Sequence, residues 1–421
     1  TDKIQIDGDK WTSAKATLTN DLLELKQVKI EVNSLEAFAR TKELRLKSAV
    51  NFLILDEKIK IPFWFGNRTL TKEIRYENSW NVGFDNIDKD GLYIGRKLNS
   101  LKIFENFTLD IEPQFLLQRS LQGNTKSFVN KGDSITGNKV KRNALLTDYF
   151  ALNSRIKGKI NQWNLEIDQQ NNSFDTEKFS DAIRIKTNLS KDITFLNSEW
   201  NKSFYGIYRD RVWNGSIGET EIYAGYGSKL EKQNYWVVNG VSNTESFSLG
   251  VGNFKGESLN NKNLVKTTKG SFFYSLDQNF PISVEEPSNI FVDTSYSYIS
   301  KPIRKGLSLN TKLELFYSLY GSGNNQQYFG IGAGPEFVFG NFKKKYFDYT
   351  RISVLPFYKI KSGDSFFKFD QISDKFTLEI AYDQQLFGPL LLKNSATLKV
   401  SRAKDYADFI NSKISLNWKK R

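Results

Sequence analysis

The chain of 421 residues contains no cysteine, no histidine and no methionine. Without cysteine it has no disulfide framework, no zinc finger and no cysteine-ligated iron–sulfur cluster. Without histidine it lacks the commonest general base and every nucleophile pair that depends on an imidazole. Catalysis would fall to Asp, Glu, Lys or Tyr. We therefore expect a protein that is not an enzyme and that needs no cofactor and no metal.

Long apolar runs are also missing. The nearest candidates, residues 52–55 and 389–392, have the length of a strand, whereas a helix that spans a bilayer needs about 20 apolar residues. No signal-peptide pattern is visible at the start of the chain. The chain opens at Thr1 without an initiator methionine, so we expect that a longer precursor has been trimmed.

Alternation of apolar and polar residues recurs from end to end and predicts strands with two different faces. The clearest apolar sets are Val28, Ile30 and Val32; Phe107, Leu109 and Ile111; Trp163, Leu165 and Ile167; Leu309, Leu313, Leu315 and Tyr317; Phe376, Leu378, Ile380 and Tyr382; and Ile414, Leu416 and Trp418. Long polar segments at 122–143, 252–270 and 321–327 read as loops. Short turns alternating with long loops are typical of an up-and-down antiparallel meander.

The chain changes character near residues 67–76. Before this point short strands recur every ~10 residues, and after it the predicted strands lengthen to about 9–12 residues with aromatic residues near their ends. The 33 Phe, 19 Tyr and 8 Trp carry much of the apolar weight. We therefore predict an all-β protein with a small β domain over residues 1–70 and a large antiparallel β-barrel over residues 71–421, of roughly 18–22 strands.

The two faces of these strands differ in chemistry, and this decides which environment we expect. One face carries Phe, Leu, Ile, Tyr and Trp, and the other carries Asn, Lys, Glu, Asp and Ser. A barrel in lipid turns its apolar face outward and keeps a wet lumen, whereas a soluble sandwich packs its apolar faces inward. The aromatic content favours the membrane barrel, and a soluble β-sandwich or propeller remains the alternative.

The net charge of +13 is spread along the chain. Beyond residues 343–345 and the group at 139–142, no long basic block stands out, as it would in most nucleic-acid-binding proteins. Diffuse positive charge favours an anionic amphiphile or anionic headgroups as the partner.

Residues 50–120 carry a characteristic order of features. A proline–aromatic segment, Pro62-Phe63-Trp64, is followed by a glycine-rich hairpin with Gly83, Gly91 and Gly95, and then by a strand that holds Pro113-Gln114 and ends near Arg119. This order resembles the lipopolysaccharide-assembly outer-membrane protein family (LptD, also called OstA), and most of all its short, cysteine-free cyanobacterial-type branch, which carries a segment similar to residues 208–215. Better-known members carry disulfides between their two domains, and this chain has none.

The resemblance implies a partial periplasmic OstA-like β-jellyroll followed by a transmembrane β-barrel in the bacterial outer membrane. It implies a translocon that receives lipopolysaccharide from a periplasmic LptA-like bridge and inserts it into the outer leaflet through a seam between the first and last strands, alongside outer-membrane lipid and an LptE-like plug lipoprotein. The residues expected at the gate and junction are Pro62, Phe63, Trp64, Gly83, Gly91, Gly95, Pro113, Ile414, Leu416 and Trp418. Those expected in a groove for acyl chains are Val28, Ile30, Val32, Leu44 and Leu46, which would otherwise pack a small core.

Three other classes remain open. A passive diffusion porin shares the barrel and the alternation, and a secreted glycan-binding β protein shares the composition. A hydrolase could use paired carboxylates such as Asp88 and Asp90 or Glu285 and Glu286, although adjacent acids in turns are expected to be solvated loop residues.

Overall fold

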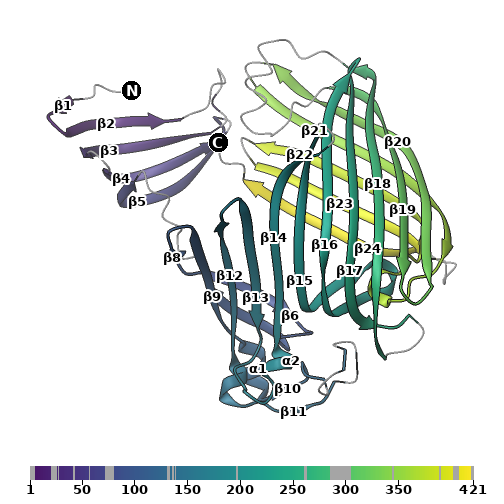
Figure 1. Cartoon of the computed structure of the whole chain (residues 1–421). Helices are drawn as coiled ribbons and strands as arrows, with labels where there is room; N and C mark the ends of the chain where they lie inside the picture. The colour runs from purple at the N-terminus through teal and green to yellow at the C-terminus, as the bar shows by residue number, and fades with distance from the viewer. Residues whose placement is uncertain are drawn as a thin grey trace.

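The computed structural model describes most of the chain. It covers residues 5–19, 26, 28–40, 43–55, 57–71, 80–129, 133–134, 137, 139–195, 198–259, 263–284, 305–343, 346–387, 390–401 and 407–418. At 39–40, 43–44, 63–71, 216, 341–343, 346–348, 385–387, 390–391, 393–401 and 407–418 it describes the backbone alone. The described chain is all-β, with two large antiparallel sheets that are consecutive in sequence (Figure 1).

The first sheet lies near the N-terminus. It contains β1 (Gln5–Asp7), β2 (Lys10–Leu18), β3 (Val28–Arg40), β4 (Glu43–Leu55) and β5 (Ile59–Thr71), in that order across the sheet. One face is apolar because alternate residues of β3 and β4 are apolar, and Val32 and Leu46 are 0% and 5% exposed. The other face is charged. There the Glu31 carboxylate forms ion pairs with Nζ of Lys15 and Nζ of Lys60, with N–O distances of 3.1 and 2.9 Å. Separation of apolar from charged residues therefore gives this sheet one apolar face and one charged face.

The second sheet is built from the remaining long strands. It contains β6 (Trp80–Asp85), β7 (Gly91–Arg96), β8 (Leu101–Phe104), β9 (Phe107–Phe115), β12 (Phe150–Ile160), β13 (Trp163–Asn171), β14 (Ile183–Phe195), β15 (Ser198–Asn214), β16 (Gly218–Val238), β17 (Val241–Glu257), β18 (Leu264–Val284), β19 (Gly306–Tyr320), β20 (Asn325–Lys343), β21 (Tyr346–Gly363), β22 (Asp374–Phe387), β23 (Leu390–Ser401) and β24 (Ala407–Trp418). From β12 to β24 the spatial order follows the sequence, then come β6, β7, β8 and β9, and β9 pairs with β12.

Several of these strands are longer than the sequence predicts. The expected length was about 9–12 residues, whereas β16 and β18 have 21 residues each. The segment 252–270, predicted as a loop, belongs largely to β17 and β18, which pair in register from Ser242↔Asn279 to Glu257↔Leu264. Its Gly and Lys residues conceal the alternation, but the backbone hydrogen bonds of a ladder do not depend on side-chain polarity.

The two ends of the second sheet differ. One end, called the turn end, includes the two-residue turns at 161–162 and 239–240. At the other, called the loop end, the connections at 116–149, 172–182, 215–217 and 364–373 carry the small elements (Figure 1). These elements are α1 (Leu117–Gln122), β10 (Asn124–Thr125), β11 (Arg142–Asn143), η1 (Leu146–Tyr149), α2 (Phe179–Ala182), η2 (Gly215–Ile217) and η3 (Lys368–Asp370). None of the helices in the described residues has the length and apolar character required to cross a membrane.

The faces of the second sheet are inverted relative to a soluble protein. On β19, Leu315, Tyr317 and Leu319 are 38%, 41% and 50% exposed, whereas Glu314 and Ser318 on the opposite face are 8% and 0% exposed. We call the first the outer face and the second the inner face, and residues directly opposite one another in a ladder share a face. A sheet that exposes its aromatic and aliphatic rows and buries its polar rows is suited to an apolar solvent.

An aromatic cluster closes part of the loop end. Phe254, Tyr320, Phe367 and Phe369 are all buried together, and the Phe367 and Phe369 rings stack with their centroids 4.9 Å apart. The 364–373 connection that carries the two last residues is held to the inner face, since the Tyr320 hydroxyl donates to the Asp370 carboxylate at 2.9 Å. This connection therefore folds back over the strand ends instead of extending into solvent.

The cluster predicts a large stability effect at its centre. Phe367→Ala should lower the free energy of unfolding by about 3–5 kcal/mol, because it empties a fully buried ring site. The denaturant midpoint of the detergent-solubilised protein measures this. Phe366→Ala, at a partly buried neighbour, is the matched control and should cost clearly less; equal losses would show that the cluster has no special weight.

Candidate functional site

The first hairpin of the second sheet is short. Strands β6 and β7 have six residues each and pair from Trp80↔Arg96 to Asp85↔Gly91. The apolar residues of β6 are almost fully turned outward, with Val82 65% and Phe84 68% exposed. Within the spatial order of strands, β6 also neighbours β24, the last strand of the chain. The hairpin therefore lies where the two ends of the second sheet meet.

On its other side the hairpin is attached to β9 by few ladder pairs. Strand β7 pairs with β9 at only two positions, Ile94↔Phe115 and Gly95↔Gln114. The next residue along β9 is Pro113, which has no backbone N–H to donate to a ladder. Regular pairing resumes between β8 and β9 at Leu101↔Leu109, and in the gap the Leu98 N–H donates to the Ile111 carbonyl at 2.9 Å.

Two glycines allow side chains to lie against the hairpin. A Cβ at Gly83 would stand 2.4 Å from the Tyr93 hydroxyl, so the ring crosses the backbone of the partner strand there. Gly91 has φ +123°, and a Cβ there would stand 1.9 Å from the Gln118 side chain, which accepts a hydrogen bond from the Leu92 N–H at 3.0 Å. Any larger residue at position 91 would meet both backbone strain and a steric clash.

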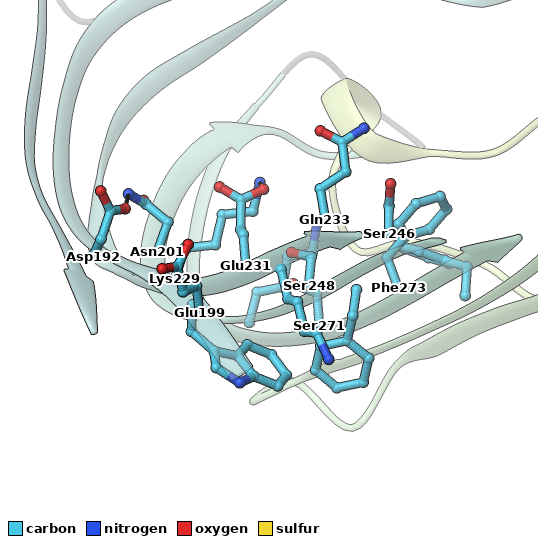
Figure 2. Close-up of a pocket in the computed structure, with 15 residues that line it drawn as sticks. Asp192, Glu199, Asn201, Lys229, Glu231, Gln233, Ser246, Ser248, Ser271 and Phe273 are labelled. Carbon is cyan, nitrogen blue, oxygen red and sulfur yellow. Dashed lines mark hydrogen bonds and ion pairs between the residues drawn. The ribbon is translucent and has the colours of Figure 1, made fainter. Parts of the chain in front are cut away.

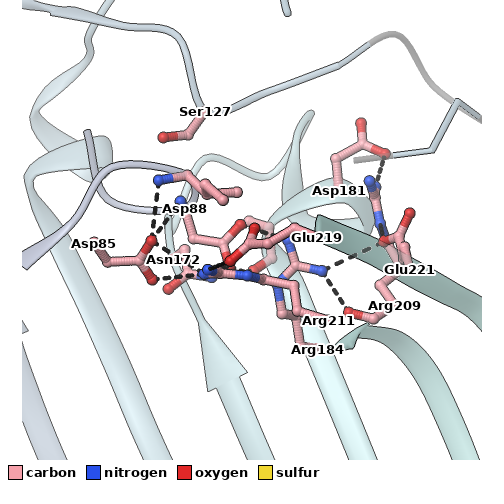
Figure 3. A network of polar contacts seen from close by, with 12 residues as sticks. Asp85, Asp88, Ser127, Asn172, Asp181, Arg184, Arg209, Arg211, Glu219 and Glu221 are labelled. Atoms are coloured by element: carbon pink, nitrogen blue, oxygen red, sulfur yellow. Dashed lines mark hydrogen bonds and ion pairs between the residues drawn. The ribbon is translucent and has the colours of Figure 1, made fainter. Parts of the chain in front are cut away.

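The turn of the hairpin is fixed by a buried arginine, Arg184, and a partly buried one, Arg211, from neighbouring strands of the sheet. The Asp88 carboxylate accepts from Arg184 Nε at 2.9 Å and from Arg211 Nη1 at 3.0 Å. Asp85, at the end of β6, accepts from the same Arg211 nitrogen at 2.8 and 3.0 Å. Figure 3 shows these groups converging from the turn, β14 and β15. The hairpin turn is thus joined to strands that follow it by roughly a hundred residues, as the sequence separation of 96 between Asp88 and Arg184 shows.

A second layer of ion pairs supports the first. Glu219 accepts from Arg211 Nη2 at 2.6 Å. Glu221, which is fully buried, accepts from Arg209 Nε at 3.1 Å and from Arg184 Nη1 at 3.4 Å. Arg209 also donates to Asp181 at 2.8 Å. We call the set Asp85, Asp88, Asp181, Arg184, Arg209, Arg211, Glu219 and Glu221 the arginine network.

The same turn is held from the loop side. Asp90 accepts from Arg119 Nε at 2.7 Å and from the Thr125 hydroxyl at 2.6 Å. Arg119 is fully buried, and its remaining donors reach the backbone carbonyls of Asp88, Asp148 and Asn172 at 2.7–2.9 Å. Lys89, between the two acids, donates to Gln114 of β9 at 2.6 Å. Every charged residue of the turn is therefore bound in place.

Electrostatics keep these acids ionised. Burial by itself would raise the pKa of Asp88, but the adjacent Arg184 and Arg211 guanidinium groups outweigh it and the pKa is lowered from 3.8. For Asp90, burial again acts upward, and the Thr125 hydroxyl and Arg119 bring the pKa below its ordinary value. A buried ion pair contributes little over an apolar replacement, yet removing one partner leaves a buried charge uncompensated. The arrangement therefore fixes geometry more than it adds stability.

The structure places the sequence-predicted gate residues in two separate regions. Gly83, Gly91, Gly95 and Pro113 lie in or beside the first hairpin, and the backbone of Ile414, Leu416 and Trp418 lies in β24, next to β6 in the strand order. Pro62, Phe63 and Trp64 do not flank this hairpin; they belong to β5, the edge strand of the first sheet, where Pro62 pairs with Phe52. An edge strand tolerates proline because one side of its backbone has no partner.

The predicted acyl-groove residues lie on neighbouring strands of the first sheet. Val28, Ile30 and Val32 are on β3, and Leu46 is on β4 opposite Ala37. Leu44 is on β4 too, at a position where the backbone alone is described. Val32 and Leu46 are buried, and Val28 and Ile30 are partly buried. This placement suits a groove and a small core equally.

The expectation that acids in turns are solvated is wrong for Asp88 and Asp90, which are 4% and 8% exposed. Glu285 and Glu286 lie outside the described residues. The arginines that bind Asp88 and Asp90 were not predicted from the sequence. The available signal was Arg209 and Arg211 in the 208–215 segment, where two arginines in a row of aromatic and apolar residues needed acidic partners somewhere in the fold.

The arginine network predicts a stability change with a defined pH dependence. Asp88→Asn should cost about 3–5 kcal/mol of unfolding free energy at neutral pH, because Arg184 and Arg211 lose their shared counter-charge. Since the folded-state pKa of Asp88 is lowered, its contribution is complete above 3.8 and is lost as the pH falls below that value. The variant should therefore show a shallower loss of stability in acid than the parent chain.

Chemical denaturation in detergent at pH 7 and at several acidic pH values measures both effects. Asp133→Asn, at an exposed loop position, removes the same charge outside the network and should change neither stability nor slope. A parent and an Asp88→Asn protein with equal midpoints at pH 7 would contradict the assignment.

Comparison with curated proteins gives no match. The sequence profile of one family, described as a protein of unknown function (DUF3769), matches residues 1–421. Because the match covers the whole chain, the protein belongs to the DUF3769 family.

Proposed function

We propose that the protein is an outer-membrane translocon for lipopolysaccharide, with the second sheet closed as a transmembrane β-barrel and the first sheet in the periplasm. The observation that carries the proposal is the first hairpin. It is pinned at its turn by the arginine network, and it is joined to β9 by a ladder of two residue pairs that stops at Pro113. A hairpin that is anchored at its turn and sparsely bonded to β9 can shift as a unit, and its other edge, β6, is then suited to part from β24.

The exposed surface supports a lipid environment for the barrel. The outer face carries aromatic and aliphatic residues on successive strands, among them Leu249 and Val251 on β17, Leu319 on β19, and Ile331 on β20 at 43–59% exposure. In water such rows would form an extended apolar surface, which soluble monomers rarely show. In a bilayer they face hydrocarbon while the inner face lines a polar lumen.

The order of the two sheets supports a path for a glycolipid. Strand β6, the first strand of the barrel in sequence, begins at the turn end and runs toward the 86–90 turn. The apolar face of the first sheet can shelter acyl chains, and the polar inner face of the barrel can admit a saccharide head. A seam between β6 and β24 would then let the chains leave sideways into lipid while the head passes through the lumen.

Transport in this scheme is non-catalytic, and the driving energy comes from a periplasmic bridge that delivers the lipid to the first sheet. The partners are therefore lipopolysaccharide, a bridge protein of the LptA type and outer-membrane lipid. A plug lipoprotein of the LptE type is a further proposal.

A disulfide across the seam should block the activity. The chain has no native cysteine, so pairs introduced at Val82 on β6 and at Ile414, Ser415 or Leu416 on β24 form the only possible bridges. After oxidation, the appearance of newly made lipopolysaccharide at the cell surface should fall to a small fraction of that before oxidation, and a reductant should restore it.

The matched control uses two serines that face one another in a ladder far from the seam, Ser190 on β14 and Ser203 on β15. Ser190→Cys with Ser203→Cys should oxidise without effect on delivery. Different migration of unboiled and boiled samples on a gel verifies folding. Undiminished delivery of lipopolysaccharide by the β6–β24 cross-linked protein would contradict the lateral seam. A steady, wide ion conductance, with no lipopolysaccharide defect in cells depleted of the protein, would instead identify a diffusion porin.

The two faces of the first sheet should differ in their contact with lipid. A photo-activated cross-linking residue at Leu46, on the buried apolar face, should capture lipopolysaccharide in living cells. The same residue at Lys47, the exposed neighbour on the opposite face, is the control and should capture far less. Equal capture at both positions would show that Leu46 belongs to a closed core.

A further inference from the structure

A cavity of the inner face extends from β14 to β19. It measures about 780 Å³, which is within the range of small-ligand sites. Direct ladder partners build its floor as one continuous row, in which Asp192, Asn201, Glu231, Ser248, Phe273 and Phe316 follow one another strand by strand. The row therefore changes from carboxylate and amide groups at one end to aromatic rings at the other.

Side chains of the polar end stand on the same side of the sheet. Figure 2 shows Asp192, Asn201, Glu231 and Gln233 raised on one side of the strands. The Asn201 amide donates to Asp192 at 2.8 Å, which orients both groups. Carboxylates accept and amides both donate and accept, so this end offers hydrogen bonds to a ligand rich in hydroxyl groups.

The aromatic end offers flat apolar surface. Phe273 lies opposite Phe316 in the ladder, and Phe316 stacks on Tyr328 with ring centroids 5.4 Å apart and an interplanar angle of 19°. Serines border these rings, since Ser271 also lines the cavity. Rings beside hydroxyl groups suit a ligand that has an apolar face and polar edges, as a sugar ring does.

The charges of the cavity argue against an anionic ligand. Among its lining residues there is no arginine, and all three lysines are engaged: Lys229 with Glu231, Lys269 with Asp370, and Lys232 with the Ser198 hydroxyl and over the Trp200 ring. Asp192, Glu199 and Glu231 bring three carboxylates to the same space. A phosphate or sulfate group would meet these carboxylates without a free cation to bind it.

We propose that this cavity is a binding subsite for the uncharged sugars of the transported glycolipid, formed by the Asp192–Phe316 row, and that it excludes phosphorylated or otherwise anionic sugars. The identity of the ligand as the head of a transported lipid rests on the proposed function; the affinity of the cavity for neutral sugar does not. The net charge of +13 of the whole chain is thus no guide to the charge of this part of the lumen.

Calorimetric titration of the full-length protein with two probes tests the proposal. The protein is held in an amine-oxide detergent, since a maltoside detergent would compete, and the probes are maltohexaose and sulfated maltohexaose. Maltohexaose should bind, and the sulfated form should bind at least about tenfold more weakly, because its charges face the cavity carboxylates.

Matched variants locate the site. Phe273→Leu should weaken binding of maltohexaose roughly threefold to tenfold, whereas Phe272→Leu, at the neighbouring residue on the outer face, should leave it unchanged. Glu199→Gln should lower the ratio of the dissociation constants of sulfated and unsulfated maltohexaose by about threefold to tenfold. This variant provides the test if the ring substitutions prevent folding.

Three results would overturn the proposal: no binding of maltohexaose, equal or tighter binding of the sulfated probe, or identical effects of Phe273→Leu and Phe272→Leu. If maltohexaose does not bind but the β6–β24 disulfide blocks delivery, the sugar site is rejected and the proposed translocon stands. If maltohexaose binds but the cross-linked protein still delivers lipopolysaccharide, the sugar site stands and the proposed lateral seam is rejected.

Discussion

The position of the first hairpin depends on the pairing of Asp88 with Arg184 and Arg211. Strand β6 has six residues and β7 has two ladder pairs with β9, so backbone hydrogen bonds alone hold this hairpin weakly. The buried carboxylates of the turn replace the missing ladder with charge-assisted hydrogen bonds to β14 and β15. The proposed seam is therefore a compromise, in which the turn is rigid and the strand edges are free to separate.

The inversion of the two faces is the second constraint. Polar rows are buried on the inner face and aromatic rows are exposed on the outer face, so the alternation that would build a soluble sandwich would, in the proposed barrel, separate lipid from water. The inner face is also uneven. The arginine network lies at the loop end, and the Asp192–Phe316 row begins near the turn end of β14 and β15, away from this network.

Local pattern predicted much of the fold. Alternation located β3, β9, β13, β19, β22 and β24, and the all-β class is confirmed, because a period of two residues is a property of each strand by itself. It failed at 252–270, where glycines and lysines interrupt the pattern within paired strands. The assignments of residues 1–70 and 71–421 to two domains remain predictions, although the described sheets divide between Thr71 and Trp80.

The site was less predictable because its contacts are non-local. Gly91 and Pro113 stand out in any reading, but the burial of Asp88 depends on arginines from strands that the sequence does not place beside it. Pro62 lies in the first sheet, within the predicted 1–70 domain, and it does not lie beside the first hairpin with Pro113. Diffuse positive charge predicts an anionic partner, and this stays a prediction, because net charge does not show that Lys229 and Lys269 of the inner cavity are already paired with carboxylates.

The sequence separation within the arginine network also dictates an order of assembly. Asp85 and Asp88 bind arginines that lie 126 and 96 residues downstream. Their turn therefore cannot be held in place until β14 and β15 have formed. Closing so long a loop is slow compared with pairing adjacent strands. The first hairpin of the sheet is consequently made early but fixed at its turn late, after the two strands that hold it.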